Sequence, residues 1–214
     1  MSSRALVVIV TGSAAAIGLP DYLAELGQAL DHPLTVLLTE TAERFVDPEV
    51  ASWFADEVLT CDTPGLDPVE LAHTAGGLVV LPASGHTLAC AALGLMGTPA
   101  AAALAEAPTP SLYFPAMSGV VWGRAAIRRH VADLRQQGDT VVEPRAADVP
   151  GGGPAVLPPT PVEVAATVLD FLADVVAEVV GEVVGEVVGE AVADLPTGFP
   201  VVEVKGAEAR SLHG

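Results

Sequence analysis

The residues best suited to chemistry are Ser84, His86 and Thr87, in the stretch PASGHT at residues 82–87. They directly follow the apolar run GLVVL and precede the helical pattern LACAALGLM. Hydroxyl and imidazole groups donate and accept hydrogen bonds, and an imidazole exchanges its proton near neutral pH. Because ligands of α/β proteins commonly bind where a strand gives way to a helix, we expect this junction to hold a ligand.

A second candidate junction is VTGSAA at residues 10–15. Gly12 lets the backbone turn closely, and Ser13 and the amides after it point at the start of a helix, where an anion is favoured. The pattern is not G-x-G-x-x-G, and it is not a P-loop because no Gly-Lys-Ser/Thr follows. It fits a single phosphate monoester.

Apolar runs of strand length alternate with helical patterns along the chain, whose 214 residues suit one domain. The expected strands are residues 5–10, 34–39, 77–82, 111–117 and 139–144. The expected helices between them are residues 18–30, 42–57, 86–96 and 123–138. This alternation predicts an α/β fold with a parallel sheet covered on both faces. We expect the chemistry at the carboxyl ends of the first four strands.

Composition and charge limit the partners. Hydrophobic residues make up 51% of the chain but aromatic residues only 4%, which indicates a core of Ala, Val and Leu. The net charge of −18 argues against nucleic acid and against anionic membrane surfaces as partners.

The two cysteines, Cys61 and Cys90, are too few for a disulfide framework and lack metal-ligand spacing. We therefore expect reduced, structural thiols and no metal. The apolar run near the N-terminus has six residues and runs straight into a Gly-Ser turn, which is short for a signal peptide. A cytoplasmic protein is expected.

The rest of the chain divides into two further segments after a domain at residues 1–145. Residues 146–161 hold five prolines and three consecutive glycines, so we expect no regular element there but a linker or a mobile flap. Residues 162–214 hold a helical pattern and then the repeat VVGEVVGEVVGE. Acids fall at every fourth residue from 170 to 194, which excludes a membrane span and stacks like charges on a helix. A low-complexity acidic extension, a frayed helix or disorder, is expected.

Four stretches occur in a fixed order, each after an expected strand: TGSAAAIGLPDYL, VLLTETAERFV, LPASGHTLACAALG and PAMSGVVW. Together they resemble the homo-oligomeric flavin-containing cysteine decarboxylases, and most of all the peptidyl-cysteine branch that acts in lanthipeptide-type biosynthesis. The resemblance covers about residues 4–145. It implies a flavodoxin-like, doubly wound three-layer fold, FMN as the cofactor, and assembly as a homotrimer or homododecamer.

The resemblance also implies which residues contact the cofactor and the substrate. The implied FMN contacts are Gly12, Ser13, Ala14, Thr39, Thr41, Ser84, Gly85, His86, Thr87 and Ala116. Met117 and Trp122 would pack against the substrate or the subunit interface, although core packing explains both equally well. His86 and Ser118 stand where the family has asparagine, and Pro68 stands where it has its catalytic histidine.

In such enzymes the oxidised flavin accepts a hydride from the β-carbon of a C-terminal cysteine, and the resulting thioaldehyde loses carbon dioxide to give an enethiolate. A base near the cysteine sulfur is needed because the thiolate reacts more readily than the thiol. Asp67, His73 and His86 are the candidates for this base, and Ser118 completes the expected catalytic set. An exposed or core-edge position would explain His73 without a catalytic role.

The expected function is FMN-dependent oxidative decarboxylation of the C-terminal cysteine of a ribosomally made precursor peptide, giving an enethiol for aminovinyl-cysteine formation. One alternative is a phosphopantothenoylcysteine decarboxylase or flavin prenyltransferase, although residues 146–161 lack the flap cysteine of the coenzyme A pathway enzymes. Another alternative is a non-catalytic FMN-binding or regulatory subunit. A flavin absorption band and a decarboxylation assay separate these possibilities.

Overall fold

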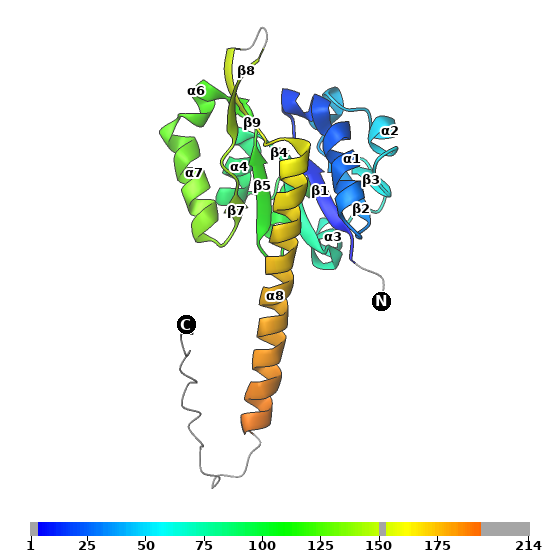
Figure 1. Ribbon diagram of the computed structural model, residues 1–214, viewed down its shortest axis with the longest axis vertical. Coiled ribbons are helices and arrows are strands. Elements are labelled where there is room, and N and C mark those ends of the chain that lie inside the picture. The colour runs from blue at the N-terminus through cyan, green and yellow to red at the C-terminus, as the bar shows by residue number, and fades with distance from the viewer. Residues whose placement is uncertain (1–3, 150–152, 194–214) are drawn as a thin grey trace, which may run out of the picture. The chain divides into compact units, whose positions relative to one another are not determined.

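The computed structural model describes residues 4–149 and 153–193. The chain divides into one unit at Met1–Val176 and another at Ala177–Gly214. The first unit contains a parallel six-stranded sheet with the strand order β3-β2-β1-β4-β5-β7 (Figure 1). Its strands are β1 Leu6–Val10, β2 Leu34–Leu38, β3 Glu57–Thr60, β4 Gly77–Ala83, β5 Ser111–Pro115 and β7 Thr140–Val141. The predicted flavodoxin-like doubly wound fold is confirmed.

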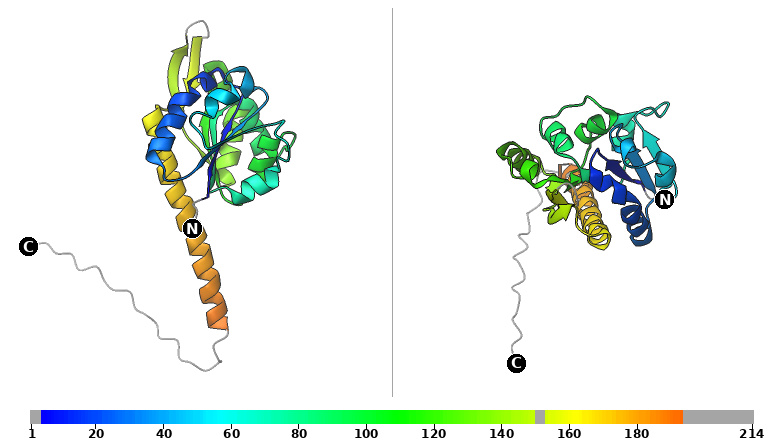
Figure 2. Two further views of the ribbon diagram at one scale, coloured as in Figure 1. Left: turned by 90° about the vertical axis from the view of Figure 1, so that its right-hand side faces the viewer. Right: turned by 90° about the horizontal axis from the view of Figure 1, so that it is seen from above.

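Helices cover both faces of this sheet (Figure 2). On one face lie α1 Leu19–Ala29 and the first part of α8 Pro161–Ala193. On the other face lie α3 Pro68–Thr74, α4 Gly85–Ala92, α5 Pro99–Ala105 and α7 Ala125–Gln136. The helices after β1 and after β4 therefore lie on opposite faces, and the two strands are neighbours in the sheet.

The central strands read as continuous apolar runs because both of their faces are buried. In β1, Leu6, Val8 and Val10 belong to one core cluster, whereas Val7 and Ile9 belong to the other. Successive side chains of a strand point to opposite faces, so a strand that is covered on both sides needs an apolar residue at every position. All five predicted strands are present, although only two residues of the fifth, predicted at 139–144, form the strand β7.

The helix predicted over residues 42–57 is interrupted. The chain forms a 3₁₀ turn at Ala42–Arg44 and then the short helix α2 at Pro48–Ala51. Asp47 starts α2, since its side chain accepts a hydrogen bond from the N–H of Glu49 at 2.8 Å. The strand β3 then follows. It was not predicted, because as an edge strand it buries only Leu59 and shows no apolar run.

The prediction that residues 146–161 form no regular element is wrong. Strands β8 Arg145–Val149 and β9 Gly153–Leu157 pair in antiparallel fashion, and β9 also pairs with the two-residue strand β6 Met117–Ser118 (Figure 1, top). The prolines permit this hairpin because Pro154 lies near its tip and the others lie outside the two strands.

Helix α8 begins with a reciprocal cap. The N–H and the hydroxyl of Thr160 donate to Glu163 Oε2 at 2.9 and 2.7 Å, and the N–H of Glu163 donates back to the Thr160 hydroxyl at 3.4 Å. These hydrogen bonds hold the pKa of the Glu163 carboxyl below its usual range. The helix continues to Ala193, so the repeat is helical as far as the structure describes it, and residues 194–214 of the predicted extension lie outside that part. Among the described residues, no helix has the length and apolarity needed to cross a membrane.

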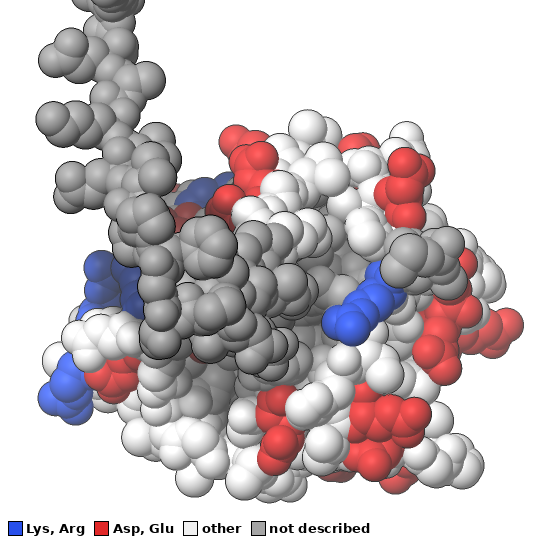
Figure 3. Space-filling model, turned by 90° about the horizontal axis from the view of Figure 1, so that it is seen from below, with Lys and Arg blue, Asp and Glu red and all other residues white. Residues whose placement is uncertain are grey.

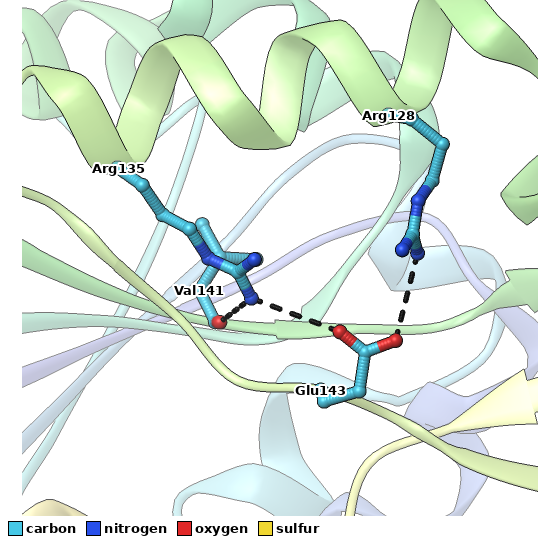
Figure 4. A network of polar contacts seen from close by, with 4 residues as sticks. All are labelled: Arg128, Arg135, Val141 and Glu143. Atoms are coloured by element: carbon cyan, nitrogen blue, oxygen red, sulfur yellow. Dashed lines mark hydrogen bonds and ion pairs between the residues drawn. The ribbon is translucent and has the colours of Figure 1, made fainter.

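An ion-pair network holds α7 beside the loop after β7 (Figure 4). Glu143 lies 3.5 Å from Arg128 and 3.7 Å from Arg135, and Arg135 also donates to the carbonyl oxygen of Val141 at 2.6 Å. The three charged side chains are about half exposed, so each pair contributes less than about 1 kcal/mol. Elsewhere on the surface acidic side chains form several separate groups, as the face in Figure 3 shows.

Candidate functional site

A cavity of about 350 Å³ lies at the carboxyl edge of the sheet. Its walls come from the ends of four strands, β1 to β4, and from α4 and the start of α5. The polar and sulfur-bearing lining residues are Thr11, Thr39, Glu40, Thr41, Cys61, Ser84, His86, Thr87, Cys90 and Thr98. Because β1 and β4 are neighbours whose following helices lie on opposite faces, the cavity occupies the switch point of the fold, where ligands of doubly wound sheets bind.

Thr11 joins the loops after β1 and β4. Its hydroxyl donates to the carbonyl oxygen of Pro82 at 2.8 Å and accepts from the N–H of Ser84 at 2.9 Å. The residue is only 1% exposed, so the Thr11 hydroxyl is shielded from water and its two hydrogen bonds fix the two loops relative to each other.

Ser13 joins the same region to the loop after β5. Its hydroxyl donates to the carbonyl oxygen of Ala116 at 3.3 Å, and the N–H of Ala116 donates to the carbonyl oxygen of Ala83 at 2.9 Å. Ser13 also caps a short 3₁₀ turn at Ala14–Gly18, through the N–H of Ala15. The predicted phosphate loop therefore leads first into a 3₁₀ turn, and α1 begins only at Leu19.

Gly12 leaves no room for a side chain, because Thr41 lies directly against it. A Cβ atom placed on Gly12 would collide with Cγ2 of Thr41 and lie 2.6 Å from its Cβ. Carbon atoms without a bond between them do not approach so closely, so no larger residue fits at position 12 while Thr41 stays in place. The glycine thus lets the loop after β2 pack directly against the loop after β1.

The PASGHT stretch forms the end of β4 and the start of α4, as predicted. Ser84 caps the helix, because its hydroxyl oxygen accepts from the N–H of Thr87 at 3.2 Å and lies 3.0 Å from the Thr87 hydroxyl. At Gly85 a Cβ atom would lie 3.3 Å from Ile127 and 3.6 Å from the sulfur of Met117. Ser84 and Thr87 both face the cavity.

His86 lines the cavity from the first turn of α4, and its side chain is exposed. Among the residues that line the cavity, it alone can carry a positive charge. Its Nε2 lies 3.4 Å from Sγ of Cys90, one helical turn later. The cavity therefore holds an imidazole beside a thiol, and the exposed residue Glu40 adds a carboxylate to its lining.

The structure does not bring Asp67 or His73 to this cavity. Asp67 caps α3, where its carboxylate accepts from the N–H groups of Val69 and Glu70 at 2.9 and 3.3 Å. His73 is exposed in the last turn of α3, and β4 begins four residues later, at Gly77. It lies near the amino end of that strand, about 20 Å along it from PASGHT.

The first cavity is not lined by Met117, Ser118 or Trp122, which follow β5 in the chain. Met117 and Ser118 line a second hollow of about 240 Å³, between Ser13 and Ala14 on one side and the β8–β9 hairpin on the other. Ser118 also caps the short helix α6, Gly119–Trp122. Trp122 packs at the edge of the core, and the guanidinium of Arg128 lies 4.9 Å from its ring centre.

Several lining residues were not foreseen from the sequence. Thr11 could have been found, because a polar residue at the end of a buried strand needs a hydrogen-bond partner. Cys90 carried a signal too, since it stands four residues after His86 on a predicted helix, and such residues share a face. Cys61 carried none, because it follows the unpredicted strand β3.

A model of the family described as Flavoprotein matches residues 1–172. The chain belongs to this family. Among curated relatives, it is 24% identical over 147 residues to mersacidin decarboxylase of a Bacillus strain, covering 67% of this chain and 75% of the relative. It is 32% identical over 152 residues to the coenzyme A biosynthesis bifunctional protein CoaBC of Mycobacterium tuberculosis. That match covers 69% of this chain but only 36% of CoaBC.

Several solved structures share the fold of this chain. MrsD from Bacillus superposes with a TM-score of 0.70 at 23% identity, covering 79% of this chain and 96% of that one. The FMN-dependent cysteine decarboxylase TvaF, from thioviridamide biosynthesis, is 29% identical with a TM-score of 0.63, over 67% of this chain and 91% of that one. A variant of EpiD in complex with the substrate peptide DSYTC has a TM-score of 0.70 at 21% identity, over 78% and 97% of the two chains.

Proposed function

We propose that the protein binds FMN in the cavity at the switch point and oxidatively decarboxylates the C-terminal cysteine of a ribosomally made precursor peptide. The product would be an enethiol that serves aminovinyl-cysteine formation. The observation that carries the proposal is the convergence of the loops after β1, β2 and β4 on one cavity. These loops bear the three sequence stretches that resemble the flavin-binding motifs.

The residues of the cavity suit a flavin nucleotide. Thr39, Thr41, Ser84 and Thr87 offer hydroxyl groups to its polar edges, and the close packing at Gly12 keeps side chains out of the wall there. Ser13 and Ala14 lie on the adjoining hollow, and the backbone of Ala116 closes the gap between them and β4. When bound, FMN would supply a two-electron acceptor for the hydride of the substrate β-carbon.

His86 is the base that this arrangement favours. Of the three candidates, it alone lines the cavity, whereas Asp67 caps a helix and His73 lies toward the other edge of the sheet. An imidazole can take the proton of the substrate thiol near neutral pH and return it to the product. In its charged form it would also attract the carboxylate of the peptide terminus.

The hairpin and the oligomer would complete the peptide site. Met117, Ser118 and the β8–β9 hairpin surround the second hollow, which can take an extended peptide tail beside the cofactor cavity. Exposed apolar side chains flank the site at Leu93, Leu95, Met96 and Val120. An apolar surface of this kind favours burial against another subunit, as in the proposed homotrimer or homododecamer of a cytoplasmic enzyme.

The test begins with the purified protein and FMN, and a bound flavin absorption band is expected. Peptides that end in cysteine should then lose carbon dioxide and two hydrogens, about 46 Da, whereas matched peptides that end in serine should not change. His86→Ala should keep the flavin and lose turnover. A protein that takes up no flavin, or that binds it and leaves every cysteine peptide intact, would refute the proposal. Loss of turnover in His73→Ala, with His86→Ala active, would reassign the base.

A second candidate is a phosphopantothenoylcysteine decarboxylase, which the 32% identity to CoaBC favours. The two candidates differ in the mass of the product. Net decarboxylation without oxidation removes about 44 Da, because the two hydrogens return to the substrate. Incubation with phosphopantothenoylcysteine and with a cysteine-terminated peptide therefore distinguishes them in one mass spectrum each.

A further inference from the structure

The chain has two cysteines, and both line the cavity at the switch point. They differ in what lies beside the sulfur. Cys90 has an imidazole partner, because its Sγ lies 3.4 Å from Nε2 of His86. The Sγ of Cys61 instead lies 4.0 Å from the carbonyl oxygen of Leu38. Both thiols are partly exposed, so the cavity contains one thiol beside an imidazole and a reference thiol beside a backbone carbonyl.

We propose that Cys90 and His86 form a reactive thiol–imidazole pair, and that Cys90 is a site of reversible modification by low-molecular-weight disulfides. The thiolate is the nucleophile in thiol–disulfide exchange, and a neighbouring histidine favours it by taking the proton. The helix itself does not help. Cys90 lies in the last turn of α4, where the negative end of the helix dipole disfavours a thiolate. The activation therefore depends on His86.

The exchange is balanced without any other reagent. The Cys90 thiol gives its proton to Nε2 of His86, and the thiolate attacks one sulfur of the disulfide. The sulfur–sulfur bond of the reagent breaks as the new bond to Cys90 forms, and the leaving thiolate takes the proton from His86. Cys90 is oxidised to a mixed disulfide while half of the reagent is reduced to a thiol.

The modification would compete with the cofactor. Cys90 shares the cavity with Ser84 and Thr87, which would contact FMN, so a thiol adduct on Cys90 occupies part of the same space. This consequence rests on the proposed function, whereas the reactivity of Cys90 does not. The pair would thereby make flavin uptake depend on the thiol–disulfide balance around the newly folded protein.

The experiment uses the full chain without flavin and glutathione disulfide as the probe. The rate of glutathionylation at each cysteine is followed by intact mass and by peptide mapping. We expect Cys90 to react about tenfold or more faster than Cys61. His86→Asn should slow Cys90 by about tenfold and leave Cys61 unchanged, and Cys90→Ser should abolish the fast phase. Equal rates at the two cysteines, a faster Cys61, or an unchanged rate in His86→Asn would overturn the proposal.

The comparison within the unmodified sequence decides the matter even if His86→Asn fails to fold. Both cysteines react in the same protein, and of the two only Cys90 has an imidazole beside its sulfur, so the ratio of the two rates measures the effect of the pair. A ratio near one would contradict the pairing.

Preincubation with FMN separates this proposal from the proposed function. Bound FMN should slow the labelling of Cys90, and binding without any protection would overturn the competition. If no FMN binds at all, the proposed function fails, but the ratio of the two rates in the flavin-free protein still decides the reactivity of Cys90.

Discussion

Thr11 and Ser84, 73 residues apart in the chain, meet at the carboxyl edge of the sheet, where the hydroxyl of Thr11 accepts the N–H of Ser84 at 2.9 Å. The same hydroxyl donates to Pro82 at 2.8 Å, so one buried side chain holds the start of the PASGHT loop. The cavity thus has a rigid wall before any ligand enters it.

Replacing Thr11 with valine should destabilise the fold. The variant keeps the shape of the side chain but leaves the buried carbonyl of Pro82 and the partly buried N–H of Ser84 without their partner, so we expect a loss of about 2 kcal/mol. Urea unfolding measures it, and Thr74→Val, on the exposed end of α3, is the matched control with little expected change. Equal losses in the two variants would show that the Thr11 hydrogen bonds contribute nothing specific.

Gly12→Ala should disturb the wall of the cavity through Thr41. The new methyl group would lie 2.6 Å from Cβ of Thr41, so the two loops must separate, at a cost of about 1–3 kcal/mol and with weaker flavin uptake. Because the clash includes Cβ, Thr41→Ala should not restore the variant, whereas Thr41→Gly should. Flavin titration and urea unfolding of the single and double variants test this order, and rescue by alanine would contradict it.

The stability of the protein should depend on Asp139 in the acid range. Burial raises the pKa of its carboxyl above the ordinary value, although the carboxylate accepts the N–H of Ser111 at 2.8 Å. The protonated form is therefore favoured in the fold, and its stabilising contribution is present at low pH and lost as the pH rises through the raised pKa.

Asp139→Asn removes this titration and keeps an acceptor for Ser111. We expect the variant to be at least as stable as the unmodified protein at neutral pH, and the difference to shift in favour of aspartate as the pH falls. Urea unfolding at several pH values gives the comparison. A difference that does not change with pH would refute the assignment.

Tyr22 should hold the base of the hairpin in place. Its hydroxyl donates to the carbonyl oxygen of Pro159 at 2.9 Å, and burial raises the pKa of this phenol, which keeps it protonated. Tyr22→Phe should cost about 1 kcal/mol and speed amide hydrogen exchange in β8 and β9, with the central sheet unchanged. Uniformly faster exchange across the sheet would instead indicate global destabilisation.

The elements with both faces buried could be predicted from the sequence, because burial imposes a continuous apolar run that nothing else explains. Strands β1, β2 and β4, and the loops after them that line the cavity, were located in this way. Edge strand β3 and the β8–β9 hairpin were not predicted, because each has a face exposed to solvent and therefore has no continuous apolar run. Backbone pairing, which the sequence does not display, holds them in place.

The candidate site was predictable to the same degree. Residues directly after the central strands, such as Gly12, Ser84 and His86, lie at the cavity as expected. The contact between Gly12 and Thr41 was not foreseeable, because it depends on the register of β1 against β2. The spacing of four residues between His86 and Cys90 indicates that they share a helix face, but the contact between the two side chains is known only from the structure.

Strand β9 belongs to two partners at once, β8 on one side and β6 on the other. β6 follows β5 after a single residue, Ala116, which is itself bonded to β4. The hairpin is therefore attached to the central sheet through β6 and cannot move away from the second hollow independently. Two residue pairs, Met117 with Val156 and Ser118 with Ala155, join β6 to β9, so any separation of the hairpin from β6 would pull on the segment that leads directly out of the central sheet.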